Sequence, residues 1–283
     1  MALRIVTGVM LIAAIVALLV WAPAWLVAVV AAAIALLALI EFFALGERVG
    51  LRAFRKWALV CAAGVFYAQY SAGMVETHAF GGLVLSRGYG PTVSIEIVLL
   101  AFVFGAVGIG LATRRPLQDV LPAISISSAG LLFVALPFSY LLRINEIARG
   151  GGALILFTLA LIWAGDTLAY FTGKFIGRVP MAPVLSPKKT WEGAIANLTG
   201  SLVVAWVAAR WIPIDVATLL FVAGAANIAG QMGDLIESAY KRGAGVKDSG
   251  TIVPGHGGVL DRIDSLILAA PVVWVLYSWL ALR

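Results

Sequence analysis

Apolar residues fill nine stretches of the chain, and short polar segments separate them. A helix that crosses a membrane needs about 20 predominantly apolar residues. The pattern therefore predicts an all-α, polytopic integral membrane protein with about nine transmembrane helices. The predicted helices are Leu3–Ala22, Ala24–Leu45, Trp57–Val75, Thr92–Ala112, Val120–Leu142, Gly152–Phe175, Ala194–Ala209, Val216–Ile236 and Ile263–Leu282. Pro23 is interpreted as the turn of a helical hairpin and not as part of a signal-peptide cleavage site, because a second apolar run follows at once.

The composition supports this class. Of the 283 residues, 62% are hydrophobic and 12% are charged, and the mean hydropathy is +1.03. Soluble domains carry about 25% charged residues, so soluble enzymes and disordered chains are excluded. Cys61 is the single cysteine, so no internal disulfide can form. The net charge of +6 does not indicate nucleic acid, because in a membrane protein the arrangement of charges matters more than their sum.

The basic residues predict the orientation in the membrane. With nine helices, 15 of the 20 Lys and Arg residues lie on the side of the N-terminus. The other side carries Arg87, Arg143, Arg149, Arg210 and Arg283. Cytoplasmic loops carry the excess of Lys and Arg. We therefore expect the N-terminus to be cytoplasmic.

The acidic residues are concentrated in the second half of the chain. Eight of the 14 Asp and Glu residues lie between positions 166 and 264. We predict that residues 1–150 form a scaffold of transmembrane helices. Residues 151–283 are predicted to form the catalytic region, with cytoplasmic loops at 176–193 and 238–262. For Glu41, inside an apolar helix of the scaffold, a hydrogen bond to another helix is the expected role.

A first polar segment lies inside an otherwise apolar predicted helix. Asp166, Tyr170 and Gly173 share one face of that helix at helical spacing. An intramembrane carboxylate is costly and indicates a functional site by default. The alternative is a structural hydrogen bond to a neighbouring helix.

A second polar segment runs Leu185-Ser-Pro-Lys-Lys-Thr-Trp-Glu-Gly193. Ser186 before a proline predicts a helix N-cap with proline at the first position. Lys188 and Lys189 would then oppose the helix dipole, which favours anions at this end. A polyanion bound at the helix N-terminus would account for both lysines. The alternative is a lysine pair that only marks the cytoplasmic boundary.

A third polar segment joins the last two helices. Its polar residues form two stripes at helical spacing: Asp234, Glu237, Ser238 and Lys241 before the loop, and Asp261, Asp264 and Ser265 after it. Clustered carboxylates repel each other unless a cation lies among them, and oxygen ligands suit Mg²⁺. Gly255, Gly257 and Gly258 allow close approach of the backbone to phosphate oxygens. His256 is either a phosphate contact or a donor within the loop.

The run from Ser238 to Asp264 reads Ser-x2-Lys-Arg-x4-Lys-Asp-x5-Pro-x-His-Gly-Gly-x2-Asp-Arg-x-Asp. It resembles the signature of the phosphatidate cytidylyltransferases, also called CDP-diacylglycerol synthases. The two upstream segments look like further motifs of that family, so the resemblance spans residues 160–268. Tyr240 and Val253 depart from the pattern, both conservatively.

The resemblance implies transfer of CMP from CTP to phosphatidate with release of pyrophosphate. It assigns catalytic roles to Asp234, Lys241, Asp248, Asp261 and Arg262. It implies substrate binding by Asp166, Ser186, Lys188, Lys189, Thr190, Ser238, Arg242, Lys247, His256, Gly257 and Gly258. The implied cofactor is Mg²⁺, with room for a second cation, on Asp234, Asp261 and Asp264. The implied setting is a bacterial inner membrane with the site facing the cytoplasm; a homodimer is left open, and nucleic acid is not a partner.

Three other membrane classes compete with this interpretation. A secondary transporter usually has two similar halves, whereas here the acids lie in one half. A CDP-alcohol phosphotransferase would carry Asp-Gly-x-x-Ala-Arg, which does not occur in this sequence. A polyprenol kinase or a CDP-archaeol synthase is the nearest alternative, because the nucleotide chemistry is shared and the lipid differs.

Overall fold

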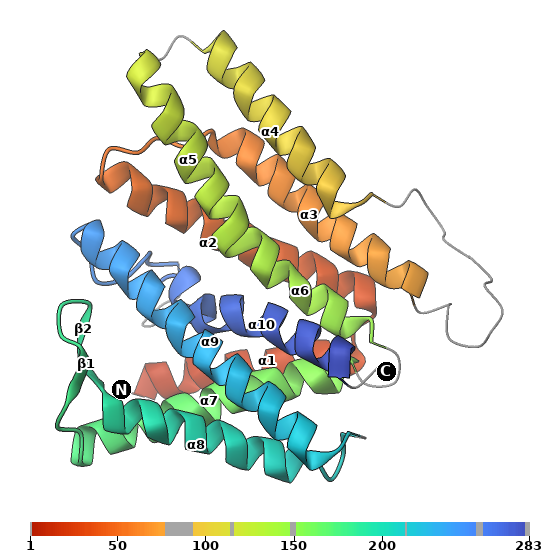
Figure 1. Ribbon diagram of the computed structural model, residues 1–283, viewed down its shortest axis with the longest axis vertical. Helices are drawn as coiled ribbons and strands as arrows, with labels where there is room; N and C mark the ends of the chain where they lie inside the picture. The colour runs from red at the N-terminus through yellow and green to blue at the C-terminus, as the bar shows by residue number, and fades with distance from the viewer. Residues whose placement is uncertain are drawn as a thin grey trace.

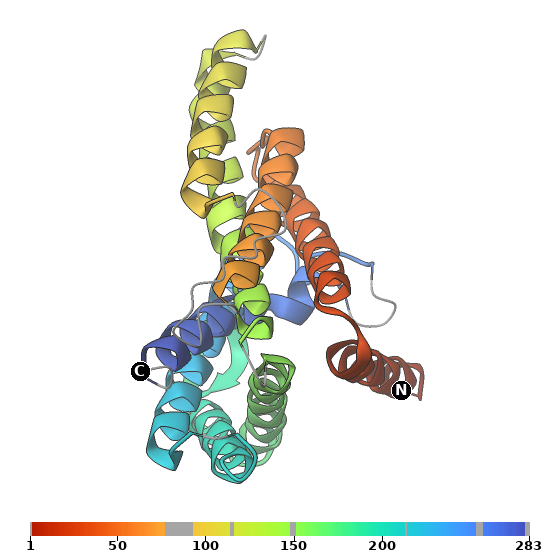
Figure 2. The ribbon, with the colours of Figure 1, turned by 90° about the vertical axis from the view of Figure 1, so that its right-hand side faces the viewer.

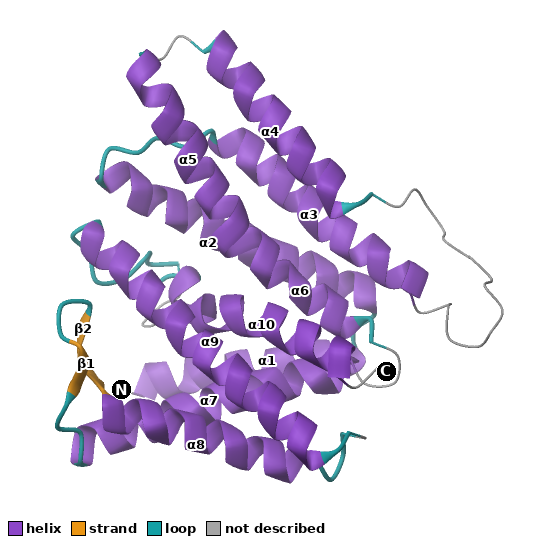
Figure 3. Ribbon diagram, in the orientation of Figure 1, coloured by secondary structure: helices purple, strands orange, loops and turns teal. Residues whose placement is uncertain are grey.

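The described part of the chain is almost entirely helical (Figure 1, Figure 3). A computed structural model describes residues 2–76, 93–113, 116–147, 151–212, 214–252 and 257–280. Its helices are α1 (Ala2–Trp21), α2 (Ala24–Arg48), α3 (Arg55–Glu76), α4 (Ile95–Ala112), η1 (Leu117–Asp119), α5 (Val120–Gly130), η2 (Leu131–Ala135), α6 (Leu136–Asn145), α7 (Gly151–Phe175), α8 (Trp191–Ala208), α9 (Val216–Gly243) and α10 (Leu260–Leu280). A β-hairpin of β1 (Pro180–Ala182) and β2 (Ser186–Thr190) lies between α7 and α8.

Each of the nine predicted segments contains a helix, and the fifth is one rod made of η1, α5, η2 and α6. Among the described residues, six helices are long and apolar enough to cross a membrane. They are Ala24–Arg48, Ile95–Ala112, Leu117–Asn145, Gly151–Phe175, Val216–Gly243 and Leu260–Leu280. The all-α membrane class is therefore confirmed, whereas the number of nine crossings and the orientation stay predictions.

The helix α10 holds the molecule together. It packs against α9 and α6 and also contacts α2 and α7. The helices α7, α8 and α9 form a group of their own, and α2 to α6 form the other side of the molecule (Figure 1, Figure 2). One apolar core runs through both groups, with Phe43 of α2, Leu142 of α6 and Leu161 of α7 fully buried. The core therefore joins helices from both sides of residue 150, and the division into a scaffold and a catalytic region stays a prediction.

Large apolar side chains cover the outer surface of the helices. Phe104, Leu111, Leu121 and Trp211 are 73%, 85%, 72% and 75% exposed. In water such a surface would be costly, at about 25 cal/mol for each Å² of apolar area. Lipid tails are as apolar as these side chains and solvate them without that cost. The apolar surface is thus consistent with an integral membrane protein.

The prediction of a helix start at Ser186 is wrong. Residues Ser186–Thr190 form β2, which pairs antiparallel with β1, and α8 begins only at Trp191. The hydroxyl of Thr190 caps α8 by accepting the N–H of Gly193 at 3.2 Å. The first turn of α8 then contains Glu192 and no lysine, in agreement with the helix dipole. The unfavourable placement of two lysines in a first turn was the sign that the helix starts later.

Glycines allow the closest helix contacts. A Cβ added at Gly233 of α9 would overlap the backbone carbonyl oxygen of Asp264 of α10. Gly200 of α8 lies against Gly165 of α7, where an added Cβ would be 3.3 Å from the Cα of Gly165. Small residues at such contacts let helix backbones approach closely. The position of α10 against α9 thus depends on the absence of a side chain at Gly233.

We expect Gly233→Ala to lower stability by about 1–3 kcal/mol, because the carbonyl that it meets is backbone and cannot turn away. Gly108→Ala is the matched control, since a Cβ at Gly108 of α4 meets no atom within 4 Å. Thermal unfolding of both variants in detergent measures the difference. An unfolding midpoint of Gly233→Ala at or above that of Gly108→Ala would contradict the close approach.

Candidate active site

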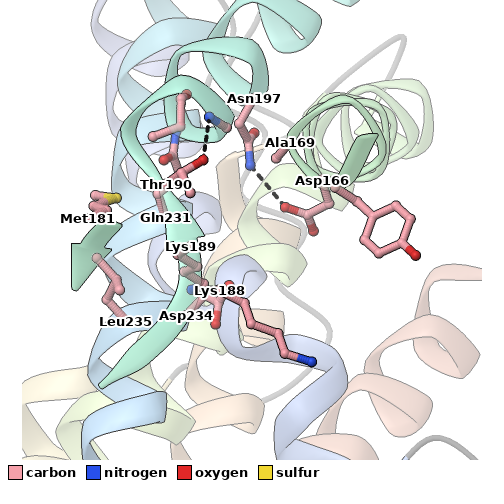
Figure 4. Close-up of a pocket in the computed structure, with 13 residues that line it drawn as sticks. Asp166, Ala169, Met181, Lys188, Lys189, Thr190, Asn197, Gln231, Asp234 and Leu235 are labelled. Atoms are coloured by element: carbon pink, nitrogen blue, oxygen red, sulfur yellow. Dashed lines mark hydrogen bonds and ion pairs between the residues drawn. The ribbon is translucent and has the colours of Figure 1, made fainter. Parts of the chain in front are cut away.

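A cavity of about 300 Å³ opens between α7, α8, α9 and the β-hairpin (Figure 4). Its lining includes the predicted site residues Asp166, Lys188, Lys189, Thr190 and Asp234. The other lining residues are Ala169, Tyr170, Met181, Gly193, Ala194, Asn197, Gln231 and Leu235. The cavity therefore combines charged groups with an apolar wall.

An ion pair between Lys189 and Asp234 joins the β-hairpin to α9. The Nζ atom of Lys189 lies 2.5 Å from Oδ2 of Asp234, and the two side chains are 30% and 31% exposed. Lys188, the preceding residue of β2, is exposed and extends away from this pair (Figure 4). Because both members of the pair are accessible, an anion that enters the cavity can compete with Asp234 for the amine of Lys189.

A chain of side-chain hydrogen bonds crosses α7, α8 and α9 and ends on Asp166. Gln231 donates to Oδ1 of Asn227 (2.7 Å), and Asn227 donates to Oδ1 of Asn197 (2.5 Å). Asn197 in turn donates to Oδ1 of Asp166 (3.0 Å; Figure 4). A carboxylate accepts hydrogen bonds only, so it is the natural end of such a chain. The chain fixes the orientation of Asp166 at the cavity wall.

A second charged cluster lies at the N-terminus of α10. Lys241 forms an ion pair with Glu237, one turn earlier on α9, and another with Oδ1 of Asp261 at 2.6 Å. The second oxygen of Asp261, Oδ2, accepts the N–H groups of Ser249 (2.9 Å) and Gly258 (2.8 Å). The side chains of Lys241 and Asp261 are only 12% and 5% exposed. The two predicted stripes therefore meet, and the ammonium group of Lys241 joins them.

Asp264 connects the cavity to this second cluster. It lies one turn after Asp261 on α10, and its carbonyl faces Gly233, the neighbour of Asp234. Asp264 lines a second, smaller cavity together with Gly233 and Glu237 of α9. The predicted residues of α7, α9 and α10 are thus gathered at one end of these helices, beside the hairpin.

The described side chains do not fit a metal ion held by protein ligands alone. In the part of the chain that the structure describes, no group of three or more His, Cys, Asp and Glu side chains is placed to hold a metal ion. Asp261 already accepts hydrogen bonds from Lys241 and from two backbone N–H groups. Asp234 forms an ion pair with Lys189. Magnesium on Asp234, Asp261 and Asp264 therefore stays a prediction.

The other predicted residues lie on the hairpin, at the end of α9, in the loop before α10 and in the first turn of α10. Arg242 donates to the carbonyl of Leu185 (3.2 Å) and to that of Val246 (3.0 Å), and so ties the hairpin to the loop. Gly257 has a φ of +83°, and a Cβ there would lie 2.8 Å from Oδ2 of Asp261. Lys247, Asp248 and Arg262 are exposed, Gly258 and Ser238 are buried, and Ser186 is the first residue of β2. His256 lies outside the described residues.

Sequence reasoning missed Asn197, Asn227 and Gln231. A signal for two of them exists on α9, where Asn227 and Gln231 continue the spacing of Asp234 and Lys241 toward the helix N-terminus. The polar stripe of α9 therefore begins two turns earlier than predicted. Asn197 gave a weaker signal, as a single amide within an apolar helix.

Comparison with known proteins assigns the chain to a family. The model of the cytidylyltransferase family matches residues 2–280. The chain belongs to the cytidylyltransferase family. The resemblance carried by the sequence motifs is thereby confirmed.

Several curated relatives of this cytidylyltransferase-family chain are named phosphatidate cytidylyltransferase. The Bacillus subtilis protein is 38% identical over 149 residues, which are 52% of this chain and 55% of that protein. The Staphylococcus saprophyticus protein is 41% identical over 146 residues, 51% of this chain and 55% of its own. The Brucella melitensis protein is 40% identical over 200 residues, 68% of this chain and 67% of its own. The chain thus matches about half the length of the first two relatives and two thirds of the third.

We expect Asn197→Leu to lower the thermal unfolding midpoint markedly. The substitution removes the amide donor of Asp166 and one acceptor of Asn227, which keeps the hydroxyl of Ser201 at 2.6 Å. Each lost hydrogen bond contributes about 0.5–1.5 kcal/mol, and more where one partner is charged. Thr199→Val is the control, because Thr199 is exposed on the same helix and its hydroxyl donates to the carbonyl of Ile195 one turn away. Equal midpoints for the two variants in a thermal melt would show that the chain of hydrogen bonds does not stabilise the site.

Proposed function

We propose that the chain is a CTP:phosphatidate cytidylyltransferase, a nucleotidyltransferase that forms CDP-diacylglycerol and pyrophosphate. One observation carries the proposal: charged residues of the predicted motifs gather in two clusters at α9, with Lys189 and Asp234 on the wall of the cavity and Lys241 and Asp261 at the start of α10. The family and the names of the relatives support the same reaction.

The nucleophile of the proposed reaction is the phosphate group of phosphatidate. The second pKa of a phosphate monoester is about 6, so the group is mostly dianionic at pH 7 and needs no strong base. One of its oxygens forms a bond to the α-phosphorus of CTP. The bond between that phosphorus and the oxygen bridging to the β-phosphate breaks, and pyrophosphate leaves with the electron pair. The main requirement on the protein is to position two anions and to neutralise their charge.

Lys189 is assigned the first contact with an anion. It is a half-exposed cation in the cavity, and its partner Asp234 is equally accessible. A phosphate that takes the amine of Lys189 frees the carboxylate of Asp234. Lys241 is assigned a different role, because it is enclosed between Glu237 and Asp261 and holds α9 against α10. Arg242 keeps the hairpin that carries Lys189 close to the loop before α10.

The lipid part of the substrate is assigned to the apolar residues that line the same cavity. Ala169, Tyr170, Met181 and Leu235 line it there, and Phe171 next to Tyr170 is 50% exposed on the outer face of α7. Acyl chains would reach this wall laterally from the inner leaflet, while the headgroup meets Lys189. A cavity lined by both charged and apolar side chains suits an amphipathic substrate of this kind.

The proposed arrangement in the membrane has nine crossings, a cytoplasmic N-terminus and the site on the cytoplasmic side of a bacterial inner membrane. The distribution of Lys and Arg, 15 against five, supports it. Residues 1–150 are assigned to the scaffold and residues 151–283 to the catalytic region. CTP is found in the cytoplasm, so a site on that side has direct access to it.

The activity is tested by incubating the purified protein with CTP and a panel of phosphorylated lipids in mixed micelles. We expect CDP-linked product with phosphatidate and little with a polyprenyl phosphate or with an archaeal-type ether phosphatidate. Preference for one of the other two lipids would overturn the choice of substrate. Absence of product with all three lipids would overturn the proposed reaction.

We expect Asp234→Asn and Asp261→Asn each to abolish product formation while the protein still folds. The carboxamide keeps the shape of the side chain but removes the charge that faces Lys189 or Lys241. Asp215→Asn is the control, because Asp215 caps the opposite end of α9 by accepting the N–H of Thr218 at 2.9 Å, and asparagine is an equally good N-cap. Turnover of either site variant within about tenfold of the parent would show that the carboxylate is dispensable.

The orientation predicts that single cysteines at positions 188 and 247 are labelled from the cytoplasm, and one at position 210 from the periplasm. Lys188, Lys247 and Arg210 are all exposed, so a difference in labelling reports the side of the membrane. The background is Cys61→Ser, since Cys61 is the single cysteine and is buried. Labelling of position 188 or 247 by a membrane-impermeant reagent in intact cells would contradict the cytoplasmic site.

A further inference from the structure

Glu41 is a buried carboxylate in the middle of the apolar helix α2, and the reaction described above does not use it. Glu41 is only 4% exposed. The expected hydrogen bond to another helix is present, and its partner is the N-terminus of α10. Oε1 of Glu41 accepts the N–H of Val259 at 3.0 Å, and Oε2 accepts the N–H of Leu260 at 2.8 Å. More than 200 residues of sequence separate these partners from Glu41.

Two carboxylates share the free donors at the start of α10. The first N–H groups of a helix have no partner within the helix. Of three consecutive N–H groups here, that of Gly258 goes to Asp261, whereas those of Val259 and Leu260 go to Glu41. Glu41 thus completes from a distant helix the capping that Asp261 begins, and the positive end of the helix dipole favours both charges.

Ser249 links the same two carboxylates from the other side. Its hydroxyl oxygen lies 3.0 Å from Oε2 of Glu41 and 3.0 Å from Oδ2 of Asp261, and its N–H donates to Asp261 at 2.9 Å. A Cβ at Gly250 or at Gly258 would overlap the carboxylate of Glu41. The backbone therefore closes around Glu41, and any movement of this carboxylate displaces the backbone donors that hold Asp261.

We propose that Glu41 is a positioning residue of the active site, which holds residues 249–250 and 258–260 so that Asp261 faces Lys241. The inference rests on the proposed function for its kinetic consequence, but its structural part stands on the hydrogen bonds alone. It makes α2, a helix of the predicted scaffold, a functional part of the site. Displacement of a reacting constellation by about 1 Å can cost about 100-fold in rate, so the loss of Glu41 is expected to act on turnover.

The test compares Glu41→Gln with Glu47→Gln, which changes the same group on the same helix. Glu47 is half-exposed and pairs with Arg55 at 2.9 Å. Glutamine offers one acceptor oxygen and one NH₂ group to the three donors that Glu41 satisfies, so at least one donor loses its partner. Ser249→Ala is the second variant, which removes the linking hydroxyl and leaves the buried carboxylate in place.

Amide hydrogen exchange without substrates measures the positioning directly. We expect exchange of residues 258–262 to be roughly tenfold faster or more in Glu41→Gln and faster in Ser249→Ala, with no change in Glu47→Gln. In an active parent, kcat of Glu41→Gln should fall roughly tenfold or more, while both Michaelis constants change by less than about threefold. The combined loss in Glu41→Gln/Ser249→Ala should be smaller than the product of the single losses, because both act through one loop.

Three results would overturn the inference: unchanged exchange in Glu41→Gln, faster exchange with normal kcat, or a double variant whose losses multiply. If Glu41→Gln does not fold, the exchange and kcat of Ser249→Ala decide alone, and parental values there overturn the inference. A parent that makes no CDP-diacylglycerol overturns the proposed function instead. The exchange measurement then still decides whether Glu41 positions the start of α10.

Discussion

A carboxylate within an apolar helix bundle must be surrounded by hydrogen-bond donors or cations, and this requirement organises the second half of the chain. Asp166 accepts a hydrogen bond from the side-chain amide of Asn197. Asp234 and Asp261 each form an ion pair with a lysine. Glu41 accepts hydrogen bonds from two backbone N–H groups. At Glu41 and Asp261, whose side chains are buried, an unpaired charge would cost more than any single packing contact returns. Each carboxylate therefore fixes a contact between helices: α7 with α8, the hairpin with α9, α9 with α10, and α2 with α10.

The same arrangement explains how a very apolar protein can handle anionic ligands. The positive groups of the cavity are held in place by negative ones, so the site has little unbalanced charge before a ligand binds. A phosphate that enters replaces Asp234 as the partner of Lys189, and the freed carboxylate lies at an accessible position. Gly233 brings the backbone of α10 at Asp264 against α9 beside Asp234.

The sequence predicts the helices well, because the apolar runs and the turns between them are local signals. It also predicts Asp166, Asp234, Lys241 and Asp261 as members of one site. It fails at the hairpin, since the pairing of β2 with β1 depends on a segment that lies before it and not on the residues around Ser186. For Glu41 the sequence predicts a hydrogen bond to another helix but not its partners, because the donors are backbone N–H groups, which leave no trace in residue identity.

The amides of the site show a different limit. Asn227 and Gln231 continue a periodic stripe that the sequence already contains, so a longer window would have found them. Their order in the chain of hydrogen bonds depends on which side chain of α8 faces them, and that follows only from the packing of α8 between α7 and α9. Distant contacts of this kind are set by the fold as a whole.

The central claim is that this chain transfers CMP, and not a terminal phosphate, from CTP to an anionic lipid. The most direct measurement follows two radiolabels in parallel reactions with phosphatidate, one in the α-phosphate of CTP and one in the γ-phosphate. The account predicts that the α-label enters the lipid phase and that the γ-label stays in the aqueous phase as pyrophosphate, one for each lipid formed. Transfer of the γ-label to the lipid phase, or an unlabelled lipid phase in both reactions, would contradict it.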